Sequence, residues 1–568
     1  MRPSMTVFFL ALLALLRAAA AAHFYMSNLG IAMMFHDDAN NIIQSLRWAA
    51  HPCFWPDHSV LPLGFWSLGL GFLFSKNVFI VPITTNTLLC IAVMFAAFRL
   101  TRTLFPDDDQ APIFAAALAG LHPAFLVQGM GALVEFSLLN LFALAGCESF
   151  IRFNDRNRTR DLFISAACFA AASMTRYDGW FLCAIFSCLL GAQVIGRLRA
   201  GKAIPWTFLA AFALVWAHSC AWAFHDGREP LQLFAAERRV HSPQQFASLS
   251  GCGPDWSTLL LPFRELFFHF PFFPTLPLLL WISKPRGASR QETTLPREDY
   301  LAFPLGQFFC LAPFYAFSFL SAGCHYTHLT AAGLLFIPWS AHAASRLLDG
   351  RARGLRPLPL CAALCACSSL MLLGFPRAVR HVGHFHQETL RMCAFLRGLK
   401  EDPLLRPTPR MFIQLHPNEA SGSLYESFAA FLLDPFEIPS GEDIAQGTGL
   451  LTFDRLWRPS KQGVPSAWDD RTNPSILSKP PQDVAAFMKK NSIAVAVLLS
   501  HNAALRMPPW MPLVAASGGC YLCVRKDDPI LRQAALRAAR PLIQDRRLLL
   551  YRSRRGRLGG ARPPADFL

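Results

Sequence analysis

Two adjacent carboxylates, Asp37 and Asp38, directly follow the first long apolar segment, within residues 35–41 (FHDDANN). An ionised aspartate at a membrane boundary costs free energy unless it is hydrated, paired or used. The pair is therefore either a solvated helix cap or a general base held at the membrane surface. A divalent cation, Mg²⁺ or Mn²⁺, could join if the second carboxylate takes part. Asp37 and Asp38 are candidate catalytic residues, and the neighbouring His36 is a candidate for substrate binding.

A long loop separates the acidic pair from the next apolar segment. It has roughly 40 residues and is rich in proline and aromatic residues, and loops of that length with helices of their own are usually functional. It ends in residues 61–74, which begin LPLGFW. This apolar stretch is shorter than the about 20 residues that a membrane span needs, so an interfacial or re-entrant helix is predicted.

A second set of polar residues lies between two short apolar segments, in residues 173–180 (SMTRYDGW). One interpretation is an ion pair between Arg176 and Asp178 that closes a helical hairpin, with Tyr177 and Trp180 as membrane-interface anchors. The other is that Arg176 holds a lipid phosphate through a bidentate contact. Arg176 and Asp178 are therefore candidate substrate-binding residues.

A third set lies in the loop 224–256, which carries charges of both signs. A solvated loop surface is one interpretation. In the other, Arg238 and Arg239 bind phosphate, and Asp226 or Glu237 supplies a second carboxylate.

The composition indicates that these residues belong to a membrane protein. The chain has 568 residues, of which 53% are hydrophobic and only 16% are charged, against about 25% charged in an average soluble domain. These values exclude a disordered or collagen-like chain and argue against a purely soluble enzyme. The net charge of +16 comes from short Lys and Arg clusters between apolar runs, which is typical of membrane proteins and not of nucleic-acid binding.

Most cysteines lie inside apolar runs, and Cys520-x-x-Cys523 has no second pair, so neither a disulfide framework nor a metal site is predicted.

Apolar segments recur over residues 1–376 and predict an α-helical polytopic membrane protein with about 11 transmembrane helices. The predicted spans are 5–35, 78–98, 112–127, 129–150, 161–176, 179–196, 205–224, 259–283, 301–320, 327–347 and 358–376. Arg17 lies within the first of them. Either that helix is tilted with Arg17 facing the bundle, or the span begins after Arg17.

The charges between the spans predict the orientation. The loop clusters at 152–160 and 346–356 are rich in arginine, so the side that holds them is predicted to be cytoplasmic, together with the amino end of the first helix. Residues 1–22 also resemble a secretory signal peptide, but the apolar run continues to Phe35, which favours a retained helix. The acidic pair and the carboxyl-terminal part then face outward from a multi-pass protein, and a bacterial inner membrane is the predicted location.

The composition changes after residue 376. Residues 377–528 are predicted to form an extracytoplasmic α/β domain, and residues 529–568 a basic helix and tail. The predicted elements are helices at 381–400 and 483–490, strands at 410–415 and 493–499, and a hairpin of 512–516 with 520–525.

The motifs resemble those of the GT-C-type membrane glycosyltransferases, which include the protein O-mannosyltransferases and the bacterial transferases that add aminoarabinose to lipid A. The likeness rests on the acidic pair that closes the first span, the long outer loop ending in a Pro-Leu-aromatic helix, and the Thr-Arg-x-Asp-Gly turn at 175–179. It covers the layout of residues 1–376.

The resemblance implies that a polyprenyl-phosphate sugar is the donor and that a lipid, protein or polysaccharide is the acceptor, among membrane lipids and without nucleic acid. It further implies that Asp37 deprotonates the acceptor hydroxyl, that Asp38 stands where many relatives have Glu or Asp, and that Arg176 supplies the basic group. A single in-line displacement would invert the anomeric carbon. The Arg-rich tail departs from the family pattern, and no second outer-loop carboxylate can be placed, which leaves the metal requirement open.

A polytopic transporter or a non-catalytic envelope assembly protein is the alternative. Transporters place ionisable groups near the bilayer midplane, within broken helices and often in two related halves. Here the acidic pair lies at the end of a span and no half-repeat is visible, which favours the transferase.

Overall fold

The computed structural model of the chain divides into two compact units, Met1–Arg380 and His381–Leu568. It describes residues 3–27, 37–54, 61–75, 77, 80–129, 131–225, 298–316, 325–348, 399, 402–405, 410–415, 450–452, 489, 493–499, 513–517, 520–524 and 528–544. The predicted boundary at 376/377 and the predicted spans 259–283 and 358–376 lie outside these residues. So do nearly all of the predicted helices 381–400 and 483–490.

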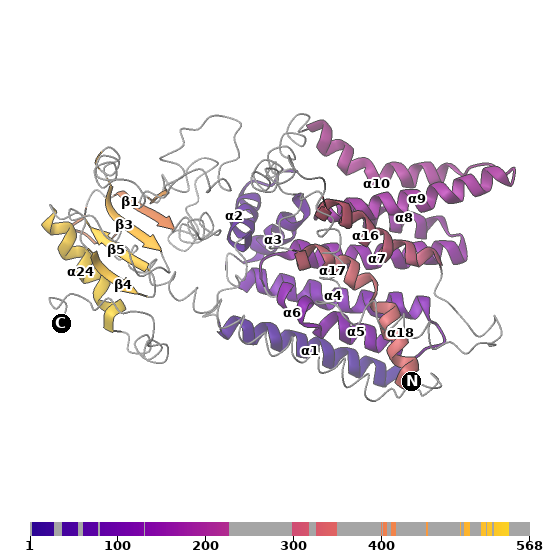
Figure 1. The fold of residues 1–568 in the computed structure, drawn as a ribbon, viewed down its shortest axis with the longest axis horizontal. Helices are drawn as coiled ribbons and strands as arrows, with labels where there is room; N and C mark the ends of the chain where they lie inside the picture. The colour runs from indigo at the N-terminus through magenta and orange to yellow at the C-terminus, as the bar shows by residue number, and fades with distance from the viewer. Residues whose placement is uncertain are drawn as a thin grey trace. The chain divides into compact units, whose positions relative to one another are not determined.

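The first unit is built of helices, most of which run along a common direction (Figure 1). They are α1 (Pro3–Ser27), α2 (Asp37–Ala50), α3 (Pro62–Phe74), α4 (Ile80–Leu104), α5 (Ala111–Leu121), α6 (Pro123–Gln128), α7 (Val134–Arg156), α8 (Thr159–Ser173), α9 (Asp178–Arg199), α10 (Trp206–His225), α16 (Glu298–Ala316), α17 (His325–Leu335) and α18 (Ile337–Leu348). Within the described ranges, α1, α4, α7 and α9 are long and apolar enough to cross a membrane. The helical bundle agrees with a multi-pass membrane protein, whereas the predicted number of spans stays a prediction.

Two segments predicted as single spans each consist of two helices. The segment 112–127 forms α5 and α6, which are separated at His122, where the backbone is extended (φ −61°, ψ 133°). Pro123 explains the break, because proline lacks an N–H and disfavours the helical conformation in the residue before it. The segment 327–347 likewise forms α17 and α18, which separate at Phe336.

Arg17 lies within α1, which is continuous from Pro3 to Ser27. The guanidinium is buried and faces the bundle: Nη1 donates to the backbone oxygen of Gly120 at 3.2 Å and Nη2 to that of Phe125 at 3.1 Å. Arg17 thus faces the bundle, as one of the two alternatives predicted, and whether the membrane span begins before or after it stays a prediction.

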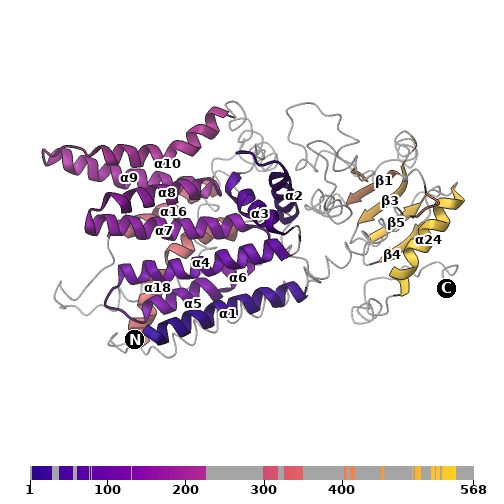
Figure 2. The same cartoon turned by 180° about the vertical axis from the view of Figure 1, so that it is seen from behind.

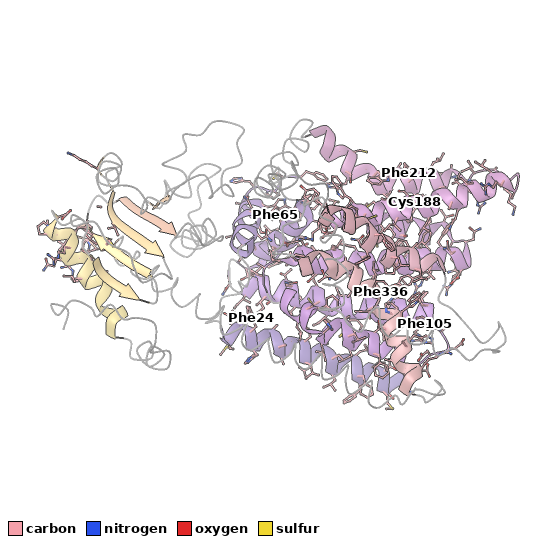
Figure 3. The ribbon with its side chains drawn as sticks, viewed as in Figure 1. Phe24, Phe65, Phe105, Cys188, Phe212 and Phe336 are labelled. Carbon is pink, nitrogen blue, oxygen red and sulfur yellow. The ribbon has the colours of Figure 1, made fainter. Side chains whose placement is uncertain are left out.

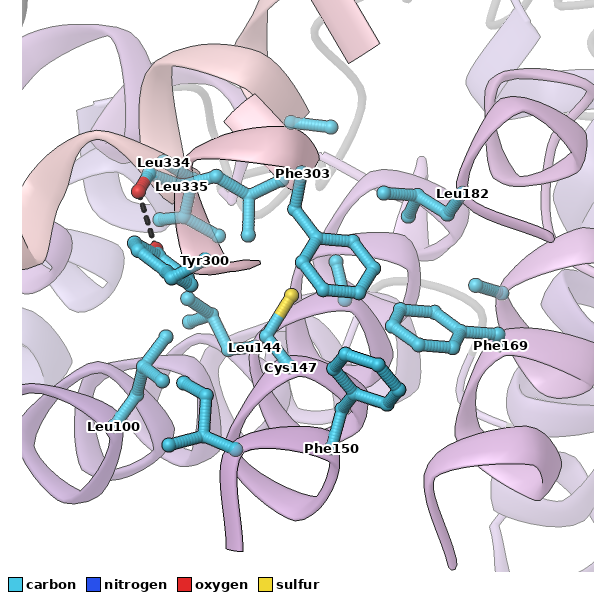
Figure 4. Close-up of a cluster of buried hydrophobic side chains, with 14 of the residues drawn as sticks. Leu100, Leu144, Cys147, Phe150, Phe169, Leu182, Tyr300, Phe303, Leu334 and Leu335 are labelled. Atoms are coloured by element: carbon cyan, nitrogen blue, oxygen red, sulfur yellow. Dashed lines mark hydrogen bonds between the residues drawn. The ribbon is translucent and has the colours of Figure 1, made fainter. Parts of the chain in front are cut away.

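The core of the first unit is apolar and aromatic. Phe150, Phe169 and Phe303 from three helices form a packed group, with the rings of Phe169 and Phe303 stacked at 5.2 Å between centroids (Figure 4). Tyr300 is buried beside them and donates its hydroxyl to the backbone oxygen of Leu335. Since an aromatic pair adds about 0.5–1.5 kcal/mol beyond its buried area, this core fixes α7, α8 and α16 against one another.

The second unit contains a five-stranded sheet with the strand order β2-β1-β3-β5-β4. Its elements are β1 (Arg410–Leu415), β2 (Leu450–Thr452), β3 (Ile493–Leu499), β4 (Leu513–Ser517), β5 (Cys520–Val524) and α24 (Pro529–Gln544). β1 pairs in parallel with β2 and β3, and β4 pairs with β5 as the predicted hairpin. The predicted strands are confirmed; the short β2 was not predicted, because three residues carry no readable alternation.

Asp108, in the turn between α4 and α5, joins that turn to α18. One carboxylate oxygen lies 2.7 Å from Nδ1 of His342, and the other accepts from Ser345 Oγ at 2.8 Å and from the amide of Ala111 at 2.9 Å. Burial opposes ionisation, but these hydrogen bonds outweigh it and lower the pKa of Asp108 from 3.8 to about 2.

We expect this contact to make stability depend on pH. Because the folded pKa of Asp108 is below the unfolded value, its contribution is complete above about pH 4 and is lost as the pH falls toward 2. Asp108→Asn should therefore lower the free energy of unfolding by about 1 kcal/mol at pH 7, and by less at pH 3. Thermal unfolding of wild type and variant at both pH values measures this, and the exposed neighbour Asp107→Asn is the control. A loss of stability in Asp108→Asn that is larger at pH 3 than at pH 7 contradicts the prediction.

Candidate active site

The helix that begins at Asp37 and the turn that carries Arg176 and Asp178 lie at one end of the bundle. In the two opposite views, α2 and α3 lie together at that end, beside the carboxyl end of α1 and the amino end of α4 (Figures 1 and 2). Phe65 of α3 lies toward this end, whereas Phe105 lies toward the opposite one (Figure 3). The α8–α9 turn reaches the same place, because the amide of Leu63 donates to the backbone oxygen of Met174 at 3.1 Å.

Helix α2 carries the acidic pair in its first turn, which Asp37 and Asp38 open. Carboxylates are stabilised at that position by the positive end of the helix dipole. One turn later, Asn41 is buried and its Nδ2 lies 3.2 Å from Oε2 of Glu135, in the first turn of α7. This contact holds α2 against Glu135, which is a third carboxylate besides Asp37 and Asp38.

Helix α3 packs closely on α2 because it has a glycine at the contact point. A methyl group on Gly69 would lie 2.3 Å from Cε3 of Trp48, whereas one on Gly64 would make an ordinary contact with Glu135 of α7. Trp48 also stacks on Trp66, with ring centroids 6.4 Å apart. The predicted helix at 61–74 is thus present, and its glycines and aromatic residues hold it beside the acidic helix.

In the α8–α9 turn, Arg176 and Asp178 form the predicted ion pair. Nε of Arg176 donates to Oδ2 of Asp178 at 3.0 Å, and the guanidinium carbon lies 3.9 Å from the ring centroid of Phe136. The side chains are 17% and 7% exposed, respectively, so both are largely withdrawn from solvent. Gln307 of α16 donates to the backbone oxygen of Asp178 at 3.0 Å, which anchors the start of α9. Arg176 is therefore held in one orientation.

Adjacent residues of α7 join the two predicted groups. Glu135 contacts α2 through Asn41, and Phe136 lies under the guanidinium of Arg176. The first turn of α7 thus lies between the helix of the acidic pair and the arginine of the Thr-Arg-x-Asp-Gly turn. Carboxylates and an oriented cation are groups that general-base catalysis and charge stabilisation can use.

Gly179 completes this turn for a steric reason. A methyl group there would lie 2.3 Å from the backbone oxygen of Ala172 and 2.7 Å from the amide nitrogen of Ser173, and a rigid helix backbone cannot move aside. Thr175 also donates to the oxygen of Ala172 at 2.6 Å, which closes the turn.

Gly179→Ala should consequently lower the free energy of unfolding by about 1–3 kcal/mol, the usual cost of overpacking. Thermal unfolding of the detergent-solubilised protein measures the change. Gly191→Ala in the same helix is the matched control, since a methyl group there meets no atom within 4 Å. Equal unfolding temperatures for the two variants would contradict the steric role.

The other predicted site residues cannot be placed. His36, Arg238 and Arg239 lie outside the described residues, as do Asp226 and Glu237. Among the residues that the structure does describe, no group of three His, Cys, Asp or Glu could hold a metal ion. The divalent cation therefore stays a prediction.

Glu135 is the site residue that the sequence analysis missed. It lies near the start of the predicted span 129–150, and a carboxylate inside an apolar segment is a signal for function. The signal was overlooked because Glu135 has no charged neighbour in the sequence; Asn41, its partner, is 94 positions away.

Comparisons with known proteins agree with this layout. The sequence model of the family described as dolichyl-phosphate-mannose-protein mannosyltransferase matches residues 51–222. The chain shares its fold with ArnT from Cupriavidus metallidurans in the apo state, with a TM-score of 0.54 and 12% identity over 92% of this chain and 97% of that chain. For ArnT bound to undecaprenyl phosphate, the TM-score is 0.50 and the identity 14%, over 92% and 98% of the two chains. A comparison with curated protein sequences gives no match.

These findings confirm the resemblance to GT-C-type membrane glycosyltransferases that the motifs indicated. At such low identity the structural likeness establishes the fold. The family match begins at residue 51, so it includes α3, Glu135 and the Arg176 turn but not the acidic pair.

Proposed function

We propose that this protein is a membrane glycosyltransferase that moves a sugar from a polyprenyl-phosphate donor to an acceptor hydroxyl on the outer face of the membrane. The observation that carries the proposal is the position of Glu135 and Phe136. These adjacent residues contact the helix of the acidic pair on one side and Arg176 on the other. The contacts of these two residues with α2 and with Arg176 support a role for both at one site, in a bundle with the GT-C fold.

Asp37 acts as the base in this proposal. A sugar hydroxyl is a poor nucleophile until its proton is removed as it attacks, and a carboxylate within hydrogen-bond reach does this. Asp38, the next residue, belongs to the same first turn of α2 and carries a second carboxylate. The attack occurs in line with the departing phosphate, so the configuration at the anomeric carbon inverts.

Arg176 stabilises the negative charge that develops on the departing polyprenyl phosphate. Arginine suits this role because its planar guanidinium pairs with phosphate oxygens and stays protonated. Asp178 and the ring of Phe136 hold the guanidinium in place, so little reorganisation is needed when the charge appears. Asp178 is a positioning residue in this scheme.

Glu135 holds the helix of the acidic pair. Glu135→Gln keeps the length of the side chain but replaces one oxygen acceptor for Asn41 by an amide. We expect the transfer rate to fall about 10- to 100-fold, the loss typical of a misplaced catalytic group, while the protein stays folded. Single-turnover transfer by the purified variant measures this. The matched control is Glu148→Gln in the same helix, where the buried carboxylate pairs with Arg99 and Arg152 away from the site.

The donor class rests on chemistry and on the shared fold. One of the ArnT structures holds undecaprenyl phosphate, and an apolar bundle supplies the surface that a long isoprenoid tail needs. The acceptor is a lipid, protein or polysaccharide at the outer leaflet. A bacterial inner membrane is the proposed location, and the loop charges favour an orientation with the site and the carboxyl-terminal unit outside the cytoplasm.

Transfer from a synthetic short-chain polyprenyl-phosphate sugar tests the function directly. The purified protein in lipid nanodiscs is incubated with the donor and with membrane extract as acceptor, and mass spectrometry follows release of polyprenyl phosphate and the new glycan. Donor-dependent glycosylation supports the proposal. Failure with a panel of donors, together with unchanged surface glycans in a deletion strain, would falsify it.

A transporter remains the alternative because of one observation. The span α5–α6 is broken next to the buried Arg17, and transporters place charged residues beside broken helices. Uptake of a labelled sugar phosphate into proteoliposomes, without transfer to an acceptor, would favour this function over the transferase.

A further inference from the structure

Four buried polar residues form a connected group inside the bundle, here called the Arg17 network: Arg17, Asn86, Cys90 and Ser137. All four are at most 8% exposed. Nη2 of Arg17 lies 3.2 Å from Sγ of Cys90, and Sγ of Cys90 lies 3.3 Å from Oγ of Ser137. The group thus runs without a break from α1 through α4 to the first turn of α7.

The charge of Arg17 is compensated by backbone carbonyls. Among the described residues, no carboxylate lies within ion-pair distance of it. The guanidinium instead donates to the oxygen of Gly120, near the end of α5, and to those of Phe125 and Leu126 in α6. The carboxyl ends of helices carry partial negative charge, so the two halves of the broken span together stabilise the buried cation.

The other end of the network fixes the start of α7. Nδ2 of Asn86 donates to the backbone oxygen of Gly131 at 2.8 Å, and its Oδ1 accepts from Oγ of Ser137 at 2.5 Å. Gly131 and Ser137 enclose Glu135 in the sequence. The residues on both sides of Glu135 are therefore tied to the same side chain of α4.

We propose that the Arg17 network positions the first turn of α7, and through it Glu135 and Phe136, for transfer. The four residues touch no reacting atom. A shift of α7 would leave buried polar groups of the network unpaired, which is costly. The network therefore holds α7 in one position against α1 and α4. This inference rests on the proposed transferase function, and its tests separate the two.

Ser137→Ala is the first test. It removes the link to Asn86 while keeping an apolar side chain of smaller volume in the core. We expect kcat to fall about tenfold with KM changed less than twofold, and Ser137→Thr, which keeps a hydroxyl, to recover most of the rate. Ser165→Ala is the matched control, because that buried serine also donates to α7, at the oxygen of Gly146 at 2.9 Å.

Coupling to Glu135 separates positioning from a general loss of packing. If Ser137 acts through the first turn of α7, Ser137→Ala should lower kcat less than twofold in a Glu135→Gln background, because residues acting as a unit are not additive. Full tenfold effects in both backgrounds would overturn the proposal.

Gly129→Ala disturbs the other end without removing the charge. A methyl group there would lie 1.8 Å from Nη2 of Arg17 and 2.4 Å from Sγ of Cys90, so it must displace the guanidinium. We expect kcat to fall about tenfold, as for Ser137→Ala. Gly196→Ala, which meets no atom within 4 Å, is the control.

Hydrogen–deuterium exchange gives a readout that does not need activity. Peptides that cover residues 129–138 should exchange at least tenfold faster in Ser137→Ala and Gly129→Ala than in wild type, with exchange in α8 and α9 unchanged. Unchanged exchange at 129–138 overturns the network even in an active enzyme. Faster exchange with unchanged kcat overturns its role in transfer, whereas a wild-type protein that transfers nothing counts against the proposed function alone.

Discussion

Asp37→Asn is expected to lower the rate of sugar transfer by about 10³-fold, which corresponds to about 4 kcal/mol of activation free energy. Asparagine has the same shape as aspartate but cannot accept the proton of the acceptor hydroxyl. The amino end of α2 favours an acidic residue only weakly, so the fold should change little. The measurement is single-turnover transfer by purified protein whose elution profile and unfolding temperature match those of wild type.

The control for this variant is Asp107→Asn. Asp107 is exposed in the turn between α4 and α5, so the substitution removes the same charge away from the site. Transfer by Asp107→Asn should stay within twofold of wild type. If Asp37→Asn transfers sugar as fast as Asp107→Asn, Asp37 is not the base, and the acidic pair is the solvated helix cap that the sequence also allows.

Arg176→Gln is expected to lower kcat/KM by about 10²- to 10³-fold. Removal of one preorganised group that stabilises developing charge costs an effect of this size. Arg176→Lys should recover only part of the loss, because an ammonium group keeps the charge but lacks the planar fork that pairs with Asp178 and stacks on Phe136. The dependence of the rate on donor concentration, with purified donor and saturating acceptor, measures both variants.

Arg197→Gln is the matched control for Arg176. Arg197 also stacks on an aromatic ring, that of Phe208 at 5.2 Å, but it lies in the last turn of the same helix that Asp178 begins. Its replacement removes an arginine–aromatic contact without touching the proposed site. Equal losses in the two variants would mean that Arg176 stabilises the fold and does not bind phosphate.

The contacts of Arg176 join the two interpretations that the sequence left open. The ion pair with Asp178 is present, as the structural interpretation predicted. It is withdrawn from solvent and lies beside Phe136, which follows Glu135, so a cation held in this way is also suited to receive phosphate. The two interpretations differ in whether Arg176 also binds a lipid phosphate, and the Arg176 variants decide that question.

The sequence determined the features that depend on composition and on short segments. The low charge content and long apolar runs predicted a membrane bundle, because the bilayer demands the same residue types wherever a helix crosses it. The strands at 410–415 and 493–499 were readable from their apolar residues, and the Thr-Arg-x-Asp-Gly turn from its spacing. These patterns are local, so each segment carries its own signal.

The tertiary structure alone decided which distant residues meet. Arg17 was ambiguous in the sequence, because the carbonyls that neutralise it belong to α5 and α6, more than a hundred positions away. Glu135 gained a role only when Asn41 was found beside it. Burying a polar group without a hydrogen-bond partner costs free energy, and which residue becomes that partner is fixed by the packing of whole helices, which no single segment encodes.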